Sequence, residues 1–300
     1  MEGNACQTNE KIAMRVSINT IVWNVVLTAF KLTAGIFAHS AAMLSDAVHS
    51  LSDVLSTFIV MIGVKISNKA SDENHQYGHE RFESVAAILL AVMLLATGLG
   101  IGYSGIQKII SGEYQNLVIP GTLALVAAAV SIVVKEAMFW YTRKAAKQID
   151  SGALMADAWH HRSDALSSVG SFIGILGARM GLAVLDPIAS VVICLFILKA
   201  AYDIFMDAVR KMTDEALDHE TAQTMYTIAL RQAGVIKIDK FSSRVFGDKY
   251  YVDVEIRADG ALTLVEAHHI AQMVHDALEA EFPKLKHCMV HVNPSMPEDG

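Results

Sequence analysis

The sequence predicts a polytopic α-helical membrane protein with six transmembrane helices, followed by a C-terminal cytoplasmic α+β domain of order αββαβ, ferredoxin-like or metallochaperone-like. Apolar residues make up 53% of the 300 residues and charged residues 18%, whereas typical soluble domains have about 45–50% and about 25%. Long apolar runs fill residues 1–208 and are missing from residues 209–300. The second part has ten Lys and Arg against fifteen Asp and Glu, which is typical of a small acidic domain.

The membrane domain is expected over residues 1–208 and the cytoplasmic domain over residues 209–300. A transmembrane helix needs about 20 apolar residues. Six segments satisfy this requirement, roughly 12–37, 40–66, 82–108, 117–141, 152–179 and 185–208. The residues before Ile12 are polar and lack the basic start and cleavage site of a signal peptide, so we expect the first helix to be retained.

Positive charge near the helix ends predicts the orientation. Ten Lys and Arg flank the spans on one side of the membrane, and only Lys108 and Arg179 lie on the other. The side with more Lys and Arg is the cytoplasmic one, so we expect both termini in the cytoplasm of a cell (inner) membrane protein. The net charge of −7 argues against nucleic-acid binding. Three scattered cysteines argue against a disulfide framework.

The C-terminal part has the pattern of a small α/β sandwich. Helices are expected over residues 221–232 and 264–282, and strands over 241–246, 250–257 and 288–292. Gly247-Asp248 is a turn signal between the first two strands. Thr263 followed three residues later by Glu266 is a capping-box spacing at the start of the second helix, and Pro283 ends that helix.

Two matching His-x-x-x-Asp pairs lie in the second and fifth predicted spans. They are His49 with Asp53 and His160 with Asp164. Residues four apart share one face of a helix, so two opposed faces would supply two imidazole nitrogens and two carboxylates. This is a tetrahedral set suited to Zn²⁺. An ionisable group at mid-bilayer costs about 2.5–3.5 kcal/mol on the insertion scale, which makes helix packing a poor explanation for four of them.

Further polar residues extend these faces. Asp46 and Asp157 each lie three residues before a histidine, and we interpret them as outer-sphere groups or as part of a proton path. Arg162 needs a carboxylate or water as a partner, and either Asp157 or Asp46 could serve as the carboxylate. His161 is expected to form a hydrogen bond at a helix interface.

With these motifs the chain resembles the cation diffusion facilitator family of proton-coupled divalent-metal exporters. The resemblance covers nearly the whole chain: six helices, the paired motifs in the second and fifth, and a small cytoplasmic αββαβ domain. The zinc-transporting bacterial members of known structure carry Asp where His49 stands, and the His-Asp/His-Asp version resembles animal zinc transporters. The resemblance implies a homodimer, alternating access, and exchange of a cytoplasmic divalent metal for external protons.

The resemblance also implies further sites. Asp72, His75 and His79 match a second metal site between the second and third helices, and in a helix all three would share a face. Arg81 and Asp214 match an ion pair between the membrane and cytoplasmic domains. In the cytoplasmic domain Asp253, Glu255, His268 and His291 match a regulatory metal site at the dimer interface, with Asp239 as a further candidate. Glu255 and Asn293 depart from the family pattern, which puts a binuclear site in doubt.

Several alternatives remain open at this point. An intramembrane metalloprotease would need His-Glu-x-x-His, which the sequence lacks. A channel needs sites that ions leave quickly, and a metal sensor would need fewer spans. Zn²⁺ is the expected substrate and a structural or regulatory ion. Mn²⁺ or Fe²⁺ is the alternative substrate, because Asp46 would add an oxygen ligand.

Overall fold

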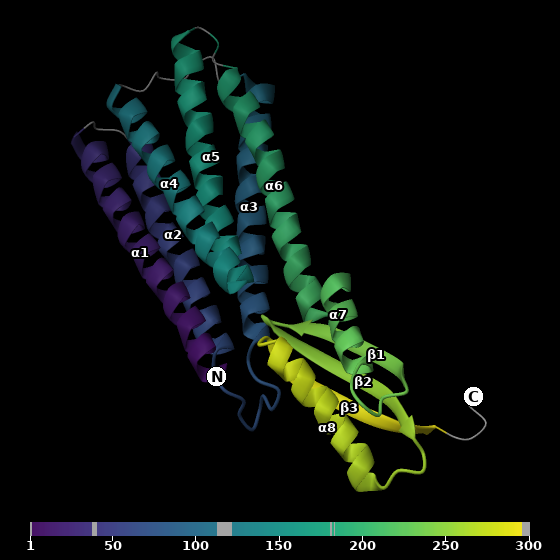
Figure 1. Cartoon of the computed structure of the whole chain (residues 1–300). Helices are drawn as coiled ribbons and strands as arrows, with labels where there is room; N and C mark the ends of the chain where they lie inside the picture. The colour runs from purple at the N-terminus through teal and green to yellow at the C-terminus, as the bar shows by residue number, and fades with distance from the viewer. Residues whose placement is uncertain (1, 38–40, 113–121, 181, 183, 296–300) are drawn as a thin grey trace. The chain divides into compact units, whose positions relative to one another are not determined.

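A computed structural model describes residues 2–37, 41–112, 122–180, 182 and 184–295, and the side chains of residues 41–52 lie outside this description. The chain divides into two compact units, close to residues 3–209 and 210–300. The first contains six helices (Figure 1): α1 (Glu2–Phe37), α2 (Ala41–Ser67), α3 (Arg81–Ser111), α4 (Thr122–Ile149), α5 (Gly152–Arg179) and α6 (Leu185–Met212).

Three stretches of the described chain are long and apolar enough to cross a membrane, namely Asn9–Thr33, Arg81–Ser111 and Pro187–Met212. They lie in α1, α3 and α6. Spans for α2, α4 and α5 remain a prediction. Helices α2 and α5 carry the predicted ligands, and α4 carries Lys135 and Glu136.

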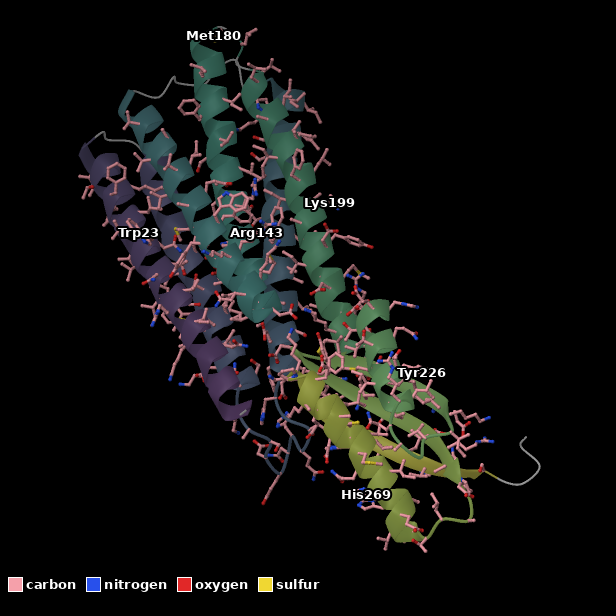
Figure 2. The ribbon with its side chains drawn as sticks, viewed as in Figure 1. Trp23, Arg143, Met180, Lys199, Tyr226 and His269 are labelled. Atoms are coloured by element: carbon pink, nitrogen blue, oxygen red, sulfur yellow. The ribbon has the colours of Figure 1, made fainter. Side chains whose placement is uncertain are left out.

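Helix packing in the first unit joins α5 to α2, α3 and α4, and α2 to α3. Small residues allow the close approach that is common between membrane helices. A Cβ atom added at Gly63 on α2 would lie 2.4 Å from the Cβ of Ala86 on α3. Large apolar side chains cover the outer faces of the helices, for example Trp23 on α1, which is 53% exposed (Figure 2). Such faces suit contact with lipid.

The second unit confirms the predicted order αββαβ. It contains α7 (His219–Leu230), β1 (Lys237–Phe246), β2 (Lys249–Asp259), α8 (Leu264–Glu281) and β3 (Leu285–Ser295). The sheet order is β1-β2-β3, with β1 and β2 antiparallel and β2 and β3 parallel. The predicted capping box is present at the start of α8, where Thr263 and Glu266 bond reciprocally. Helix α7 begins two residues earlier than predicted, because Asp218 caps it by accepting from the Thr221 amide at 2.9 Å.

One face of this sheet is covered and the other is not. Alternate residues of β2, namely Val252, Val254 and Ile256, are fully buried and pack in a core with Val274 and Leu278 of α8. Because strand side chains alternate between the two faces, Asp253 and Glu255 lie on the opposite, uncovered face. The predicted cytoplasmic ligands on the strands therefore sit on the side of the sheet away from the helices.

Candidate metal centre

Three of the four predicted transport ligands converge inside the first unit. Asp53, His160 and Asp164 are buried, and each offers a ligand atom within 4.8 Å of the other two. The Nε2 atom of His160 lies 3.4 Å from Oδ1 of Asp53. The fourth predicted ligand, His49, lies one turn before Asp53 on α2, and its side chain is outside the described part of the chain, as is that of Asp46.

The helices explain this convergence. His160 and Asp164 lie four residues apart, and therefore on one face of α5, and α5 contacts α2. Two hydroxyls cap the backbone carbonyl of Asp53: Ser56 Oγ donates to it at 2.7 Å and Thr57 Oγ1 at 3.4 Å. These two hydrogen bonds end on the backbone oxygen of Asp53. Its carboxylate contacts side chains on other helices, namely His160 on α5 and Lys135 on α4.

Sequence reasoning missed two members of this cluster, Lys135 on α4 and Asn24 on α1. The Lys135 side chain is only 1% exposed. Its Nζ atom donates to Asp53 Oδ2 at 2.6 Å, to Asp164 Oδ2 at 2.9 Å and to Asn24 Oδ1 at 3.0 Å. Asn24 is also fully buried. A cationic nitrogen thus lies between the two carboxylates, surrounded by three oxygen atoms from three different helices.

The Asp157 carboxylate contacts Thr57 and His161, which are not among the predicted metal ligands. Its Oδ1 accepts from Thr57 Oγ1 at 3.3 Å, and its Oδ2 lies 3.5 Å from Nε2 of His161 one turn along α5. Both Asp157 and His161 are buried. Asp157 therefore ties α5 to α2 next to the ligand cluster, which fits the predicted outer-sphere position, although its role in a proton path remains a prediction.

Arg162 does not pair with Asp157, one of its predicted partners, and the side chain of the other, Asp46, lies outside the described residues. Its Nη2 atom lies 3.6 Å from Glu136 Oε1 on α4, and its guanidinium lies 4.4 Å from the centre of the Phe139 ring. The sequence suggested Asp157 or Asp46 because they are close along the chain or in the matching motif. Packing of α4 against α5 instead supplies a carboxylate and an aromatic face.

The loop between α2 and α3 gathers Asp72, His75 and His79, with ligand atoms within 4.8 Å of one another. Asp72 Oδ1 lies 3.4 Å from His75 Nδ1, and Asp72 Oδ2 lies 3.4 Å from His79 Nε2. The segment is not helical, so the shared helical face that a helix would have given these three residues is absent. Asp72 Oδ1 instead accepts hydrogen bonds from the backbone amides of Asn74 and His75. These bonds form a turn that folds the loop back on itself.

Lys69 also belongs to this loop cluster. Its Nζ donates to Asp72 Oδ2 at 2.6 Å. The Lys69 ammonium, with the backbone amide of His75, holds the pKa of the Asp72 carboxyl well below its usual range. The loop therefore presents an ionised carboxylate beside two imidazoles, a donor set that suits a divalent transition metal.

The predicted ion pair between Arg81 and Asp214 joins residues of the two separate units. Arg81 begins α3, and Asp214 Oδ1 lies 3.7 Å from Nη1 of Arg244 within the second unit. Each unit is described by itself, so the pairing remains a prediction.

The predicted cytoplasmic ligands do not converge within one chain among the described residues. Glu255 and His291 are register partners on β2 and β3, and Asp253 shares their face of the sheet. His268 is on α8, which covers the other face.

Asp239, the further candidate, instead accepts hydrogen bonds from Arg257 and Asn293. These bonds keep the pKa of its carboxyl below the usual range despite the opposing effect of desolvation. His287, which lies 3.8 Å from Asp253 Oδ1, adds an imidazole on the uncovered face that the sequence reasoning had not selected.

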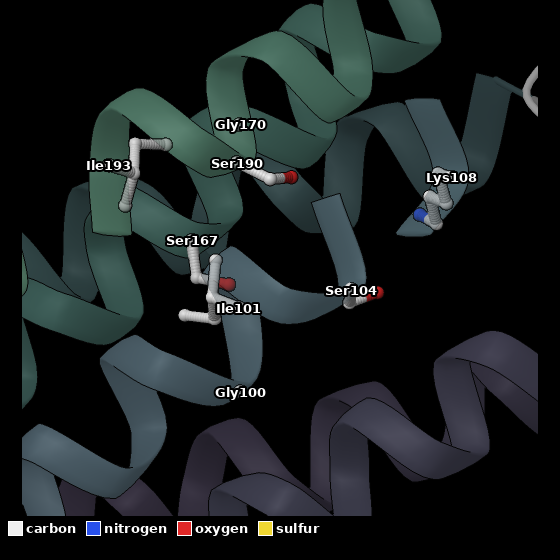
Figure 3. A pocket seen from close by; sticks show the side chains of 8 residues that line it. All are labelled: Gly100, Ile101, Ser104, Lys108, Ser167, Gly170, Ser190 and Ile193. Carbon is white, nitrogen blue, oxygen red and sulfur yellow. The ribbon is translucent and has the colours of Figure 1, made fainter. Parts of the chain in front are cut away.

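A cavity of about 280 Å³ lies between α3, α5 and α6 (Figure 3). Glycine and serine residues line most of it, and Lys108 is the one charged residue among the described residues of its lining. Ser167, which lines the cavity, lies one turn beyond Asp164 on α5, about 4.5 Å along the helix axis. Among the described residues that line it, none is a histidine or a carboxylate.

Comparison with known proteins identifies the family. The model of the cation efflux transmembrane domain matches residues 17–213, and that of the cation efflux cytoplasmic domain matches residues 217–295. An uncharacterised transporter of Methanocaldococcus jannaschii is 35% identical over 92% of this chain and 96% of its own. The manganese efflux protein MneS of Bacillus subtilis is 32% identical over 90% of this chain and 91% of its own. The magnetosome protein MamB of Magnetospira is 30% identical over 94% of this chain and 97% of its own. The chain is thus a membrane protein of the cation efflux (cation diffusion facilitator) family, a family of transporters and not of enzymes.

Proposed function

We propose that the chain is a divalent metal cation/proton antiporter that exports Zn²⁺ from the cytoplasm by alternating access. The observation that carries this proposal is the buried trio Asp53, His160 and Asp164, built from two helices with ligand atoms within 4.8 Å. Burying two carboxylates is costly unless a cation compensates them. A site with this donor set inside a helical bundle suits an ion that is bound, carried and released.

Competition between metal and protons explains the coupling. Carboxylate and imidazole ligands must be deprotonated to bind a metal, so protons and metal exclude each other. Histidine changes charge near neutral pH. When the site faces the more acidic side it takes up protons and releases the metal, which is antiport at a single site.

The choice of zinc follows from the tetrahedral set of His49, Asp53, His160 and Asp164. A second candidate is Mn²⁺ or Fe²⁺, favoured by Asn24 Oδ1, an additional oxygen 3.0 Å from Lys135 Nζ at the centre of the cluster. Oxygen-rich sites suit Mn²⁺. A relative named for manganese efflux and another named as a magnetosome protein support this second candidate.

The wider assembly we propose is a homodimer in the inner membrane with both termini in the cytoplasm. The cytoplasmic-domain match and the ten-to-two bias of Lys and Arg support this orientation. A membrane-anchored metal sensor is the alternative from another class. In the dimer, the uncovered faces bearing Asp253, Glu255 and His291 are the surfaces on which a regulatory metal would bind, with His268 drawn from elsewhere in the assembly.

The test is metal flux in proteoliposomes under an imposed pH gradient, with Zn²⁺, Mn²⁺, Fe²⁺, Co²⁺ and Cd²⁺ tested separately. We expect zinc flux that collapses when an ionophore dissipates the gradient and that Asp164→Asn abolishes. The control is Asp203→Asn on α6, because Asp203 is 57% exposed and pairs with Lys199 on the helix surface. Flux of manganese or iron alone would replace zinc by the second candidate. Absence of flux for every metal would contradict transport and favour the alternative of a membrane-anchored metal sensor.

A further inference from the structure

Lys135 occupies the position between the two carboxylates that a metal ion would need. Its Nζ lies 2.6 Å from Asp53 Oδ2 and 2.9 Å from Asp164 Oδ2. A zinc ion binds carboxylate oxygens at about 2.0–2.2 Å. An ammonium group and a metal ion that both contact these two oxygen atoms would be adjacent cations competing for the same ligands. Lys135 must therefore leave the carboxylates when the metal enters.

Charge leads to the same conclusion. Two carboxylates carry two negative charges, and a divalent metal neutralises both. Adding the Lys135 ammonium would leave a net positive charge in a site whose side chains are nine-tenths or more buried. A divalent metal ion and an ammonium group side by side repel each other, and they do so more strongly in the protein interior than at its surface. The lysine and the metal are thus alternative occupants.

We propose that Lys135 is a tethered cation that fills the transport site when the metal has left. This inference rests on the proposed function and adds a role for α4 to it. With Lys135 in place, the ammonium contacts both carboxylates and neutralises one of their two negative charges, and proton uptake offsets the other when the helices return to the loading side. Metal entry displaces the ammonium, and metal release lets it return. Lys135 therefore sets how tightly the metal binds and how quickly the empty carrier resets.

The third contact of Lys135 fits an exchangeable arrangement. Asn24 Oδ1 lies 3.0 Å from Nζ and carries no net charge. Asn24 is fully buried and its Nδ2 atom has no hydrogen-bond partner among the described residues. Asn24 therefore offers the ammonium a neutral contact that does not depend on the two carboxylates that the metal takes.

The experiment compares the native chain with Lys135→Gln in two kinds of measurement. The first is Zn²⁺ binding to the purified full-length protein, counting only the binding that Asp164→Asn removes. The second is flux in proteoliposomes, measured both as net zinc movement into metal-free vesicles and as zinc-for-zinc exchange with metal on both sides. Net movement requires the empty carrier to reset, and exchange does not. Lys199→Gln on α6 is the matched control, since this lysine is 75% exposed (Figure 2).

In Lys135→Gln we expect the zinc affinity to rise at least about tenfold, because the competing charge has gone. Net flux should fall at least about tenfold, since the empty site loses the ammonium that offsets one of its two carboxylates, while zinc-for-zinc exchange stays near the native level. Lys199→Gln should change none of these. An unchanged or weaker affinity in Lys135→Gln overturns the proposal, as does a parallel loss of net flux and exchange.

A measurement on the native chain covers the case in which Lys135→Gln fails to fold. With ¹⁵N-labelled lysine, the Lys135 Nζ resonance is assigned by its absence in Lys135→Arg. Saturation with Zn²⁺ should shift this resonance and abolish its coupling to the carboxylates. An unmoved resonance overturns the proposal. If the native protein binds zinc but transports no metal, the proposed function fails while the binding and resonance measurements still decide the role of Lys135.

Discussion

The Nε2 atom of His160 on α5 lies 3.4 Å from Oδ1 of Asp53 on α2, so one residue from each His-x-x-x-Asp pair meets the other inside the bundle. The Lys135 ammonium lies on the other side of the same carboxylate, 2.6 Å from its Oδ2. Asp53 thus contacts both the imidazole and the ammonium. It is the residue through which α2, α4 and α5 are joined at the site.

Replacing Asp53 by Ala should abolish zinc flux while the protein still folds. The change removes one ligand and one of the two carboxylates that hold Lys135, so the metal meets an uncompensated ammonium. The loss should exceed the about 10–100-fold that removal of an outer-sphere partner costs. Flux under a pH gradient measures the activity, and size-exclusion chromatography monitors folding. Native flux in Asp53→Ala would remove this residue from the site.

The sequence predicted the site better than its surroundings. A spacing of four residues places His160 and Asp164 on one face of a helix. This relationship follows from helix geometry alone and does not require knowledge of how the helices pack. Lys135 could have been recognised from the sequence, because a lysine in the predicted span 117–141 is an ionisable group at membrane depth.

Contacts between side chains on different helices could not be predicted from the sequence. Asn24 is neutral and lies in an ordinary apolar span, so only packing of α1 near α4 identifies it. Arg162 finds Glu136 for the same reason. The loop histidines were matched to Asp72 through the family resemblance, and the structure joins them through a turn in which Asp72 accepts hydrogen bonds from the amides of Asn74 and His75. The residue types were sufficient to suggest the ligands but not the backbone that holds them.

Asn24→Ala should shift the metal preference toward zinc. Loss of the Oδ1 donor beside Lys135 leaves fewer oxygen atoms around the site, and Mn²⁺ depends more on oxygen ligands than Zn²⁺ does. The measurement is the ratio of zinc to manganese flux in one proteoliposome preparation. Asn19→Ala on the same helix is the control, because Asn19 bonds Tyr141 at an exposed position. An unchanged ratio would show that Asn24 does not contribute to selectivity.

Lys69→Gln should strengthen metal binding at the loop cluster of Asp72, His75 and His79. Lys69 Nζ donates to Asp72 Oδ2, the same atom that lies 3.4 Å from His79, so it competes with a metal for that oxygen. The gain should be small because the Lys69–Asp72 pair is solvent-exposed. Zinc titration of the chain carrying Asp164→Asn isolates the loop site, and Asp72→Asn in that background should remove its binding.

The same substitution changes the titration of Asp72. The native Asp72 pKa lies well below its usual range because Lys69 and backbone amides favour the charged form. A depressed carboxyl pKa stabilises the fold above the unfolded value of about 3.9, and this contribution is lost only as pH falls through the lower folded value. Carboxyl ¹³C shifts should show Asp72 ionised below pH 3.9 in the native chain and titrating at higher pH in Lys69→Gln. Identical titrations would contradict the pairing.

Cys288 on β3 should behave as a packed thiol and not as a metal ligand. It contacts the core of the second unit, and burial, with Glu279 and Asp253 nearby, raises its pKa from 9.0 to about 12. At pH 8 the folded thiol is therefore protonated and a poor nucleophile. Maleimide labelling in a Cys6→Ser, Cys194→Ser background should be slow in buffer and fast in denaturant. Fast labelling of the folded chain would contradict this environment.

The raised Cys288 pKa also predicts a dependence of stability on pH. In the unfolded chain the thiol ionises near its usual pKa, whereas in the folded chain it keeps its proton up to about 12. Between these values the unfolded state binds fewer protons than the folded state, so stability falls as pH rises through this window. Unfolding of the cytoplasmic unit, followed by denaturant titration of the full chain at pH 8 and pH 10, should show this loss. Cys288→Ser, which keeps the shape without the ionisable thiol, should reduce it; an equal loss in Cys288→Ser would assign the pH dependence to other groups.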